Sequence, residues 1–356
     1  LVFNRDRGRS DDISIRGTST IFSESQPLIV LDNFPYDGPL ESINPNDVES
    51  ITVLKDAAAA SIWGARAGNG VIVITTKNGR RNMPLQVTFT ANVTQVEEQD
   101  PFYVPTISPS DFLEVEQDLF SRGLYNSREN SRNKPLLSPG VETLIALRDG
   151  EISQEEADRR FAVFASQDTR NDLAQFYYRP ALQQQYAMGI RGGKDQHVYG
   201  LSVGYDKNLS GTIGNDNSRL TLNLKNDWNF LNNRLRLQTG LYLVNGNSNR
   251  RTELPSGFSA NYIRLADGQG NPLAVGRGYR ETFTDGVEEL GLLDWSYYPL
   301  AERGNLINEQ EYFDLRGNLG LGYELSKGWT LDALYQNWVN SGRSWELNDE
   351  RTFYTR

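Results

Sequence analysis

The chain has 356 residues, of which 38% are hydrophobic, and its 36 basic and 46 acidic residues give a net charge of −10. This composition can build a large ordered structure, while the negative charge argues against nucleic acid as a partner. With no Cys and a single His, these residues exclude disulfides, iron-sulfur clusters, cysteine zinc sites and multi-histidine metal sites, so we expect no metal. No apolar run approaches the roughly 20 residues of a membrane-spanning helix.

Residues 1–82 have the pattern of a small α+β unit. Their apolar runs are continuous, as in strands that are covered on both faces. These runs lie at residues 28–31, 51–54 and 71–74. Asn44 followed by Pro45 marks a helix start. The glycines between Gly64 and Gly70 lack the Gly-Lys-Ser/Thr ending of a phosphate loop, so we expect a tight turn there and no cofactor.

From Leu85 onward the hydrophobic period changes to two. Apolar and polar residues alternate without exception over residues 85–94, about the length of a strand that crosses a membrane. Six later segments repeat the pattern, within residues 186–190, 199–205, 220–230, 235–243, 313–323 and 329–339. The opposite face carries charged residues such as Arg219, Lys225 and Arg316, which a dry sandwich core would not tolerate. We therefore expect that one face meets water and the other meets lipid.

The connections between these segments alternate in length. Tight turns are expected near residues 194, 232 and 327, and long connections at 96–182, 206–217 and 246–310. Short turns on one side and long loops on the other are typical of outer-membrane barrels. The first long connection contains helix starts at Ser108, Ser138 and Ser153, each followed three or four residues later by an acid.

The size of the barrel follows from what it must contain. A globular unit of residues 1–82 fits only inside a barrel of roughly 22 strands, because a barrel of about eight strands is filled by its own side chains. We therefore predict that residues 83–356 are the first seven or so strands of such an antiparallel transmembrane barrel. Both ends of the chain are expected to be cut from a longer protein, since neither carries a leader or a polar tail.

Several motifs of the first 82 residues resemble one known family. They occur in the order and spacing of the plug of TonB-dependent transporters of the SusC/RagA type. These motifs are Ile15-Arg16-Gly17, Pro27-Leu28-Ile29-Val30-Leu31-Asp32, Ile43-Asn44-Pro45-Asn46-Asp47-Val48-Glu49-Ser50-Ile51, Val53-Leu54-Lys55-Asp56-Ala57, Trp63-Gly64 and Asn69-Gly70-Val71-Ile72-Val73-Ile74. Gly192-Gly193, Arg264-Leu265-Ala266-Asp267 and Asp294-Trp295-Ser296-Tyr297-Tyr298 resemble barrel segments of that family. Asn33-Phe34 departs from the usual Gly-Val after the Asp, which puts the geometry of this plug turn in doubt.

The resemblance implies an import function without catalysis, so no enzyme is expected. Family members lie in the outer membrane of Bacteroidota and take up oligosaccharides or peptides. A SusD-like lipoprotein covers the extracellular mouth, and the TonB complex displaces the plug; its contact segment is absent from these residues. The alternative is a secreted soluble all-β glycan-binding protein, which would explain the aromatics and the acidity but not the charged inner face or the loop alternation.

The resemblance and the turn positions indicate three sets of candidate residues. Plug turn residues that could contact the substrate are Ser23, Gln26, Phe34, Tyr36 and Asp37; the alternative is that they are solvated turn residues. Arg16 matches a family position where a plug arginine pairs with barrel carboxylates, and the alternative is an exposed arginine. Partner docking is expected of Trp295, Tyr297 and Tyr298, unless these rings only pack the loops together.

Three further signals have ordinary explanations. Adjacent acid pairs such as Glu155-Glu156 do not define the carboxylate separation that a glycosidase needs. The Asp267 to Asn271 segment lacks the alternating acids of a calcium loop and is expected to be a β-turn. His197 is expected at a turn, as an interface residue rather than a proton relay.

Overall fold

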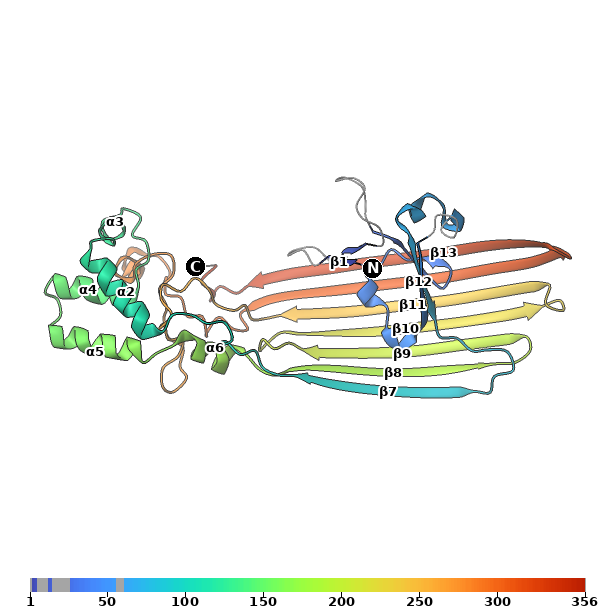
Figure 1. The fold of residues 1–356 in the computed structure, drawn as a ribbon, viewed down its shortest axis with the longest axis horizontal. Coiled ribbons are helices and arrows are strands. Elements are labelled where there is room, and N and C mark those ends of the chain that lie inside the picture. Colours follow the sequence, from blue (N-terminus) through green and yellow to red (C-terminus); the bar gives the residue numbers. More distant parts are fainter. Residues whose placement is uncertain (1, 5–11, 15–25, 56–60, 356) are drawn as a thin grey trace.

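A computed structural model of the chain describes residues 2–4, 12–14, 26–55 and 61–355, arranged as three sheets with a group of helices at one end (Figure 1). A two-stranded sheet joins β1 (Val2–Asn4) to β2 (Asp12–Ser14). A four-stranded sheet has the order β4-β3-β6-β5, and a seven-stranded sheet runs from β7 to β13. We call the part up to residue 82 the N-terminal unit and the seven-stranded sheet the large sheet.

The N-terminal unit is built around two buried parallel strands. Its strands are β3 (Leu28–Leu31), β4 (Phe34–Pro35), β5 (Val48–Leu54) and β6 (Val71–Thr76), accompanied by the short helices η1 (Leu40–Ser42), η2 (Pro45–Asp47) and η3 (Ser61–Asn69). β3 pairs with β6 in parallel, and both are mostly buried, as their continuous apolar runs predict. β5 differs from the prediction, because it lies at the edge of its sheet and leaves Ile51 60% exposed.

The large sheet is an antiparallel meander. Its strands are β7 (Gln86–Val96), β8 (Ala181–Gly193), β9 (His197–Leu209), β10 (Asp216–Phe230), β11 (Leu235–Arg250), β12 (Leu306–Ser326) and β13 (Trp329–Asn348). Each strand pairs with its neighbours in sequence, so the seven alternating segments are confirmed as strands. Within the described residues β7 and β13 are the two edges, and a closed barrel of roughly 22 strands stays a prediction.

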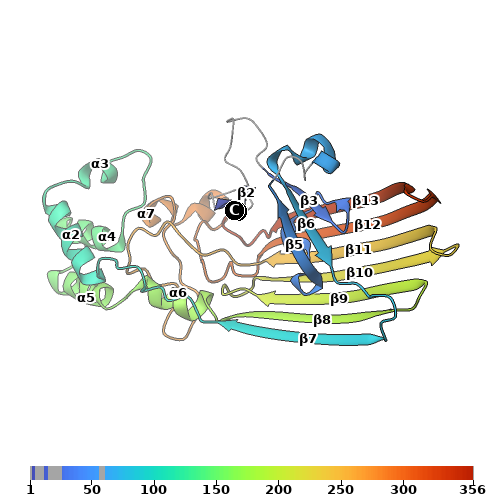
Figure 2. The ribbon, with the colours of Figure 1, turned by 45° about the vertical axis from the view of Figure 1, so that its right-hand side comes forward.

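The two faces of the large sheet differ in chemistry. Figure 2 shows the N-terminal unit standing across one face, which we call the inner face. The outer face exposes large apolar side chains, among them Phe89 at 70% and Trp329 at 72% exposure. Further exposed outer residues are Leu85, Val87, Val93, Met188, Leu220, Leu241, Leu319, Leu331, Tyr335 and Val339. An apolar surface of this extent is unusual for a protein face in water.

The connections confirm the predicted alternation. Tight turns at one end of the large sheet join β8 to β9, β10 to β11 and β12 to β13, and the other three connections lie at the other end (Figure 1). Two of these three are long, whereas the connection predicted at 206–217 is shorter than expected, because β9 continues to Leu209 and β10 begins at Asp216. The turn after β10 places Leu231, Asn232 and Asn233 at positive φ values of 54°, 56° and 70°. Gly328 supplies the turn after β12 with a φ of 85°, which glycine adopts without steric cost.

The first long connection is a helical insert. It contains α2 (Pro109–Ser121), α3 (Asn126–Glu129), α4 (Pro139–Arg148), α5 (Gln154–Ala165) and α6 (Thr169–Tyr177). The predicted caps are confirmed, because the hydroxyls of Ser108, Ser138 and Ser153 each accept a backbone N–H three residues on. The connection between β11 and β12 adds the short helices α7 (Glu281–Thr284) and η4 (Val287–Leu290). Among the described helices, none combines the length and apolarity needed to span a membrane.

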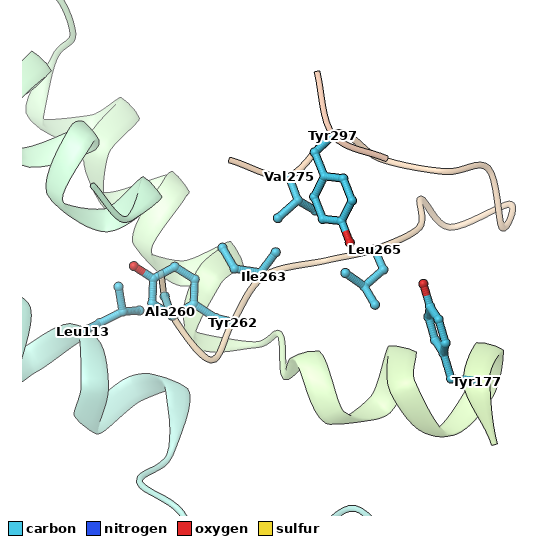
Figure 3. Packing of buried hydrophobic residues seen from close by; sticks show 8 residues of the cluster. All are labelled: Leu113, Tyr177, Ala260, Tyr262, Ile263, Leu265, Val275 and Tyr297. Carbon is cyan, nitrogen blue, oxygen red and sulfur yellow. The ribbon is translucent and has the colours of Figure 1, made fainter. Parts of the chain in front are cut away.

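The insert and the β11–β12 connection share one hydrophobic core. Figure 3 shows Leu113 and Tyr177 from the insert beside residues of the connection such as Tyr262 and Leu265. Polar contacts reinforce this core, since Asp172 pairs with Arg264 at 2.9 Å. The two long connections are therefore held together as one packed body.

A buried carboxyl lies inside this body. Glu116 of α2 is 4% exposed, and the Tyr262 hydroxyl donates to its Oε2 at 2.6 Å. The same hydroxyl accepts the Gly140 N–H of α4 at 3.1 Å, so Tyr262 joins both helices. Burial raises the pKa of the Glu116 carboxyl, and hydrogen bonds from Ser138 and Tyr262 oppose this rise.

The Glu116 carboxyl should make the helical insert pH-sensitive. Because its folded pKa lies above its unfolded value, its stabilising contribution is complete below the unfolded pKa and is lost as the pH rises through the folded pKa. Glu116→Gln cannot ionise, so the variant should lose less stability than the wild type as the pH rises from 4 toward neutrality. Hydrogen exchange of α2 and α4 in the complete protein measures the difference.

Tyr262→Phe is the control for this prediction. It removes the donor and leaves the buried carboxyl without that partner, which should cost about 1–3 kcal/mol of local stability. Parallel pH profiles for Glu116→Gln and the wild type would show that Glu116 does not titrate in the folded insert.

Candidate functional site

The candidate site is the contact between the N-terminal unit and the inner face of the large sheet. Polar side chains of β9 to β12 point at the unit there, including the predicted inner-face residues Arg219, Lys225 and Arg316. The unit meets them mainly through its segments 32–47 and 76–80. Three groups of contacts make up this interface.

The first group is an ion pair at the turn between β3 and β4. Asp32 and Asn33 form this turn at φ values of 51° and 71°, a conformation that Asn and Asp tolerate better than most residues. Lys225 of β10 reaches the Asp32 carboxylate, with 2.6 Å between Nζ and Oδ1. The unusual Asn33 therefore preserves a tight turn that aims Asp32 at the large sheet.

The ion pair belongs to a larger polar network. Asp32 accepts hydrogen bonds from the backbone N–H and the hydroxyl of Thr76, each at 2.8 Å. Asn223 of β10 donates to the Thr76 hydroxyl at 3.0 Å, and Lys225 donates to the Thr76 carbonyl at 3.3 Å. The Asp32 and Lys225 side chains are 19% and 16% exposed, so salt screens their attraction less than that of a surface pair.

The second group seats Asn44 against a glycine. Asn44 is 2% exposed; its Oδ1 accepts the Asn46 N–H and its Nδ2 donates to the Thr221 hydroxyl at 3.2 Å. A Cβ atom on Gly204 of β9 would overlap Asn44 Nδ2 and lie 2.6 Å from Thr221 Oγ1. The Asn44 side chain fits because position 204 has no side chain. We call Asn44, Gly204 and Thr221 the seat.

Glycines serve the same purpose where the unit runs into the large sheet. A Cβ atom on Gly200 would lie 2.8 Å from Asn78 Oδ1, and one on Gly79 would overlap the carbonyl of Gly192. Residues 78 and 79 can therefore approach β8 and β9 closely only because glycines occupy positions 79 and 200. The resembling Gly192-Gly193 pair lies at this point.

The third group places a tyrosine of the N-terminal unit on an arginine of the large sheet. Tyr36 is 2% exposed, and its ring centroid lies 4.1 Å from the guanidinium carbon of Arg316. Beside it the Tyr242 hydroxyl donates to the Ser42 carbonyl at 2.7 Å. Leu31, Ile43, Ile74 and Val244 complete a shared apolar cluster around these rings.

A polar cavity remains between the unit and the inner face. It measures about 160 Å³ and is lined by Asp47, Lys77, Arg191 and Ser202, among other residues. Asp47 is 6% exposed, its Oδ2 has no hydrogen-bond partner among the described residues, and burial raises the pKa of its carboxyl. A cavity of this size and polarity suits ordered water.

The predicted substrate residues do not gather at one exposed place. Ser23 lies outside the described residues, and so does Arg16, the predicted partner of barrel carboxylates. Phe34 and Tyr36 are buried at 9% and 2% exposure, so in this conformation they pack against protein rather than face a ligand. Gln26 is exposed and Asp37 pairs with Arg66, and substrate contact by either stays a prediction.

The predicted docking residues divide in a similar way. Tyr297 is 7% exposed inside the loop core, with the Arg277 guanidinium carbon 4.4 Å from its ring centroid. This burial favours the alternative that Tyr297 packs the loops together. Trp295 and Tyr298 are half-buried, and the Trp295 ring lies 5.4 Å from that of Tyr279.

Sequence reasoning assigned no role to most residues that hold the interface. Asp32, Asn44 and Thr76 come from the N-terminal unit, and Gly204 and Thr221 from the large sheet. The available signal was the row of polar and glycine positions on the inner face of β9 and β10. That row indicates which face of the sheet is polar, but it does not indicate which residue of the N-terminal unit each side chain contacts.

Residues 1–71 match the TonB-dependent Receptor Plug Domain family. A plug domain seated on the polar face of a large antiparallel sheet defines the class of TonB-dependent receptors. The TonB-dependent receptor SusC of Bacteroides thetaiotaomicron is 39% identical over 105 residues, which cover 27% of this chain and 10% of that protein. These similarities support a fragment of a SusC/RagA-type TonB-dependent receptor.

Other relatives extend the similarity along the chain. The TonB-dependent receptor P39 of Formosa agariphila is 26% identical over 289 residues, covering 77% of this chain and 24% of that protein. A solved structure of the RagAB peptide transporter shares the fold, with a TM-score of 0.63 and 21% identity, over 94% of this chain and 36% of that one. The chain thus spans about a tenth to a quarter of the length of these curated relatives.

A side chain at position 204 should disrupt the contact between Asn44 and Thr221 in the seat. Gly204→Ala places a methyl group where Asn44 Nδ2 now lies, and such overpacking costs about 1–3 kcal/mol. The plug of the full-length protein should then be cleaved several-fold faster in limited proteolysis, while the yield of folded barrel stays unchanged.

Gly246→Ala is the matched control on the same face. The nearest atoms to a Cβ there lie 3.9 Å away, which is ordinary contact. Equal proteolysis rates for Gly204→Ala and Gly246→Ala would show that the seat does not hold the plug.

Proposed function

We propose that this chain forms the plug and part of the barrel of a TonB-dependent importer in the outer membrane of a Gram-negative bacterium. The observation that carries the proposal is the polar inner face, whose hydrogen bonds and ion pairs are matched to the N-terminal unit. The exposed apolar outer face supports a lipid environment. The plug then closes a water-filled lumen.

The contacts explain why opening such a gate needs an external force. A typical hydrogen bond contributes about 0.5–1.5 kcal/mol net, and the interface contains several, together with the Asp32–Lys225 ion pair. A total of about 5.5 kcal/mol already shifts a two-state equilibrium by about 10⁴-fold. A pull by TonB, powered by the inner-membrane proton gradient, would supply this energy.

The cargo is proposed to be an oligosaccharide or a peptide. One solved relative is described as a peptide importer, RagAB. A SusD-like lipoprotein is the proposed partner at the end with the long connections, where the packed body of insert and β11–β12 connection offers a firm surface. Half-buried Trp295 and Tyr298 are the docking candidates there, together with loop surface around them.

A soluble glycan-binding protein is not favoured. Its large sheet would expose an extended apolar face to water and would carry a charged face toward the N-terminal unit without a lumen to explain it. We propose no catalytic activity for these residues.

The topology follows from the entry of the plug from the periplasmic side. Long connections should be extracellular and tight turns periplasmic, so an epitope inserted at Gly268 should be labelled on intact cells and one at Lys327 should not. Gly268 is a suitable point because a Cβ atom there meets no neighbour within 4 Å. Surface labelling at Lys327 alone would reverse the orientation.

A covalent lock tests the import function directly. An ideal Cβ atom on Gly204 lies 3.2 Å from Asn44 Cγ, so Asn44→Cys with Gly204→Cys brings two sulfurs within reach of a disulfide. These residues contain no other Cys. Cells that depend on the full-length protein for one cargo, identified on a panel of glycans and peptides, should stop growing on it when the bridge forms.

Reductant and the two single variants are the controls. Growth should return on reduction, and neither single cysteine should abolish it under oxidation. Undiminished growth with the bridge fully formed would contradict import past a mobile plug.

A further inference from the structure

The starting observation is a fully buried ion pair on the inner face of β12. Arg316 and Asp314 are 2% and 0% exposed and lie two residues apart, so both point to the same side of the strand. Two nearly parallel hydrogen bonds of 2.8 and 2.9 Å join them. Charged side chains on this face would be expected to contact lumen water. Because this pair is buried, other side chains must cover it.

Two aromatic rings cover the guanidinium. The Arg316 guanidinium carbon lies 4.1 Å from the ring centroid of Tyr36 and 4.6 Å from that of Trp338. Trp338 belongs to β13 and also donates to Asp314 Oδ2 at 2.9 Å, so its ring is part of the barrel wall. Tyr36 belongs to the plug. The Trp338 ring therefore stays beside Arg316 when the plug moves, whereas the Tyr36 ring leaves with the plug.

The plug holds Tyr36 in place by its own bonds. The Tyr36 N–H donates to the Ile29 carbonyl at 2.9 Å, and its hydroxyl donates to the Pro39 carbonyl at 3.2 Å. A Cβ atom on Gly38 would lie 2.7 Å from the Tyr36 hydroxyl and 2.9 Å from Arg316 Nη2. The close approach of this segment to the arginine therefore depends on glycine.

We propose that Tyr36 is the latch of the plug, with Arg316 as its receptor on the wall. A cation held over a ring is attracted most when water is excluded, and this contact exists only while the plug is seated. The Asp314 and Trp338 contacts of Arg316 persist after the plug moves, so the latch favours the closed state without being needed for the wall. In this pair the wall carries the cation. In the predicted arrangement the plug carries it, because the plug residue Arg16 pairs with wall carboxylates.

The inference rests on the proposed gating function and is tested on the full-length protein. Tyr36→Leu removes the ring, whereas Tyr36→Phe keeps it and loses only the hydroxyl. In cells lacking TonB, Tyr36→Leu should raise sensitivity to a large antibiotic that the closed barrel excludes by about tenfold, and Tyr36→Phe should stay within about twofold of wild type. Spontaneous openings in planar bilayers should follow the same order.

Phe34→Leu is the matched control, because it removes a buried ring of the same hairpin that has no described contact with Arg316. Barrel yield and heat-modifiable migration monitor folding. If Tyr36→Leu lowers the yield, Tyr36→Met, which fills similar volume without a ring, takes its place. In a background with Asp314→Asn and Arg316→Met, loss of the Tyr36 ring should add less than twofold to the leak.

The possible outcomes distinguish a failure of the Tyr36 latch from a failure of the proposed import function. Three results would overturn the latch. The first is wild-type antibiotic sensitivity of the variant that lacks the Tyr36 ring, and the second is an equal leak from Phe34→Leu. The third is a full tenfold effect in the background without the ion pair. Any of these results together with a working disulfide lock would leave the import function intact. Failure of the lock itself would remove the import function on which the latch depends.

Discussion

Polar groups buried between the plug and the inner face of the large sheet are the constraint on which this structure depends. The inner face carries charges and amides, and each must find a partner when the plug excludes water from it. Lys225 meets Asp32 and Thr221 meets Asn44, while glycines at positions 200 and 204 let the backbones approach. The sequence of the wall is therefore matched to the plug position by position.

In the proposed importer, the same chemistry would make separation reversible. Partners that leave a hydrogen bond would be rehydrated by lumen water, so each contact would cost only its small net value. An extended apolar interface would bind more tightly and would leave exposed hydrophobic surface on opening. Among the described residues, the apolar part is one cluster around Tyr242 and Val244, and the Arg316–Tyr36 contact and the Lys225–Asp32 ion pair involve the same two parts of the molecule. In the importer proposed above, the plug would be held firmly enough to close the lumen and weakly enough to be pulled away.

The end of the large sheet that carries the long connections is held together mainly by a hydrophobic core. The insert and the β11–β12 connection are long, yet they share a core around Tyr262 and Leu265, and Asp172 fixes Arg264 between them. Ordered loops of this kind lose little conformational freedom when a partner binds. Tyr297, which the sequence suggested as an anchor, helps to build that surface from within.

The sequence alone determined the elements and their chemistry. The period of two, the seven strands, the capped helices and the turn positions follow from local geometry, since side chains alternate across a strand and Ser or Asn caps act within three residues. It could not determine partners across the interface, because Asp32 and Lys225 are brought together only when the plug stands on the sheet. Tyr36 shows the difference most clearly: its turn position suggested exposure, and only the tertiary structure placed a wall arginine over its ring.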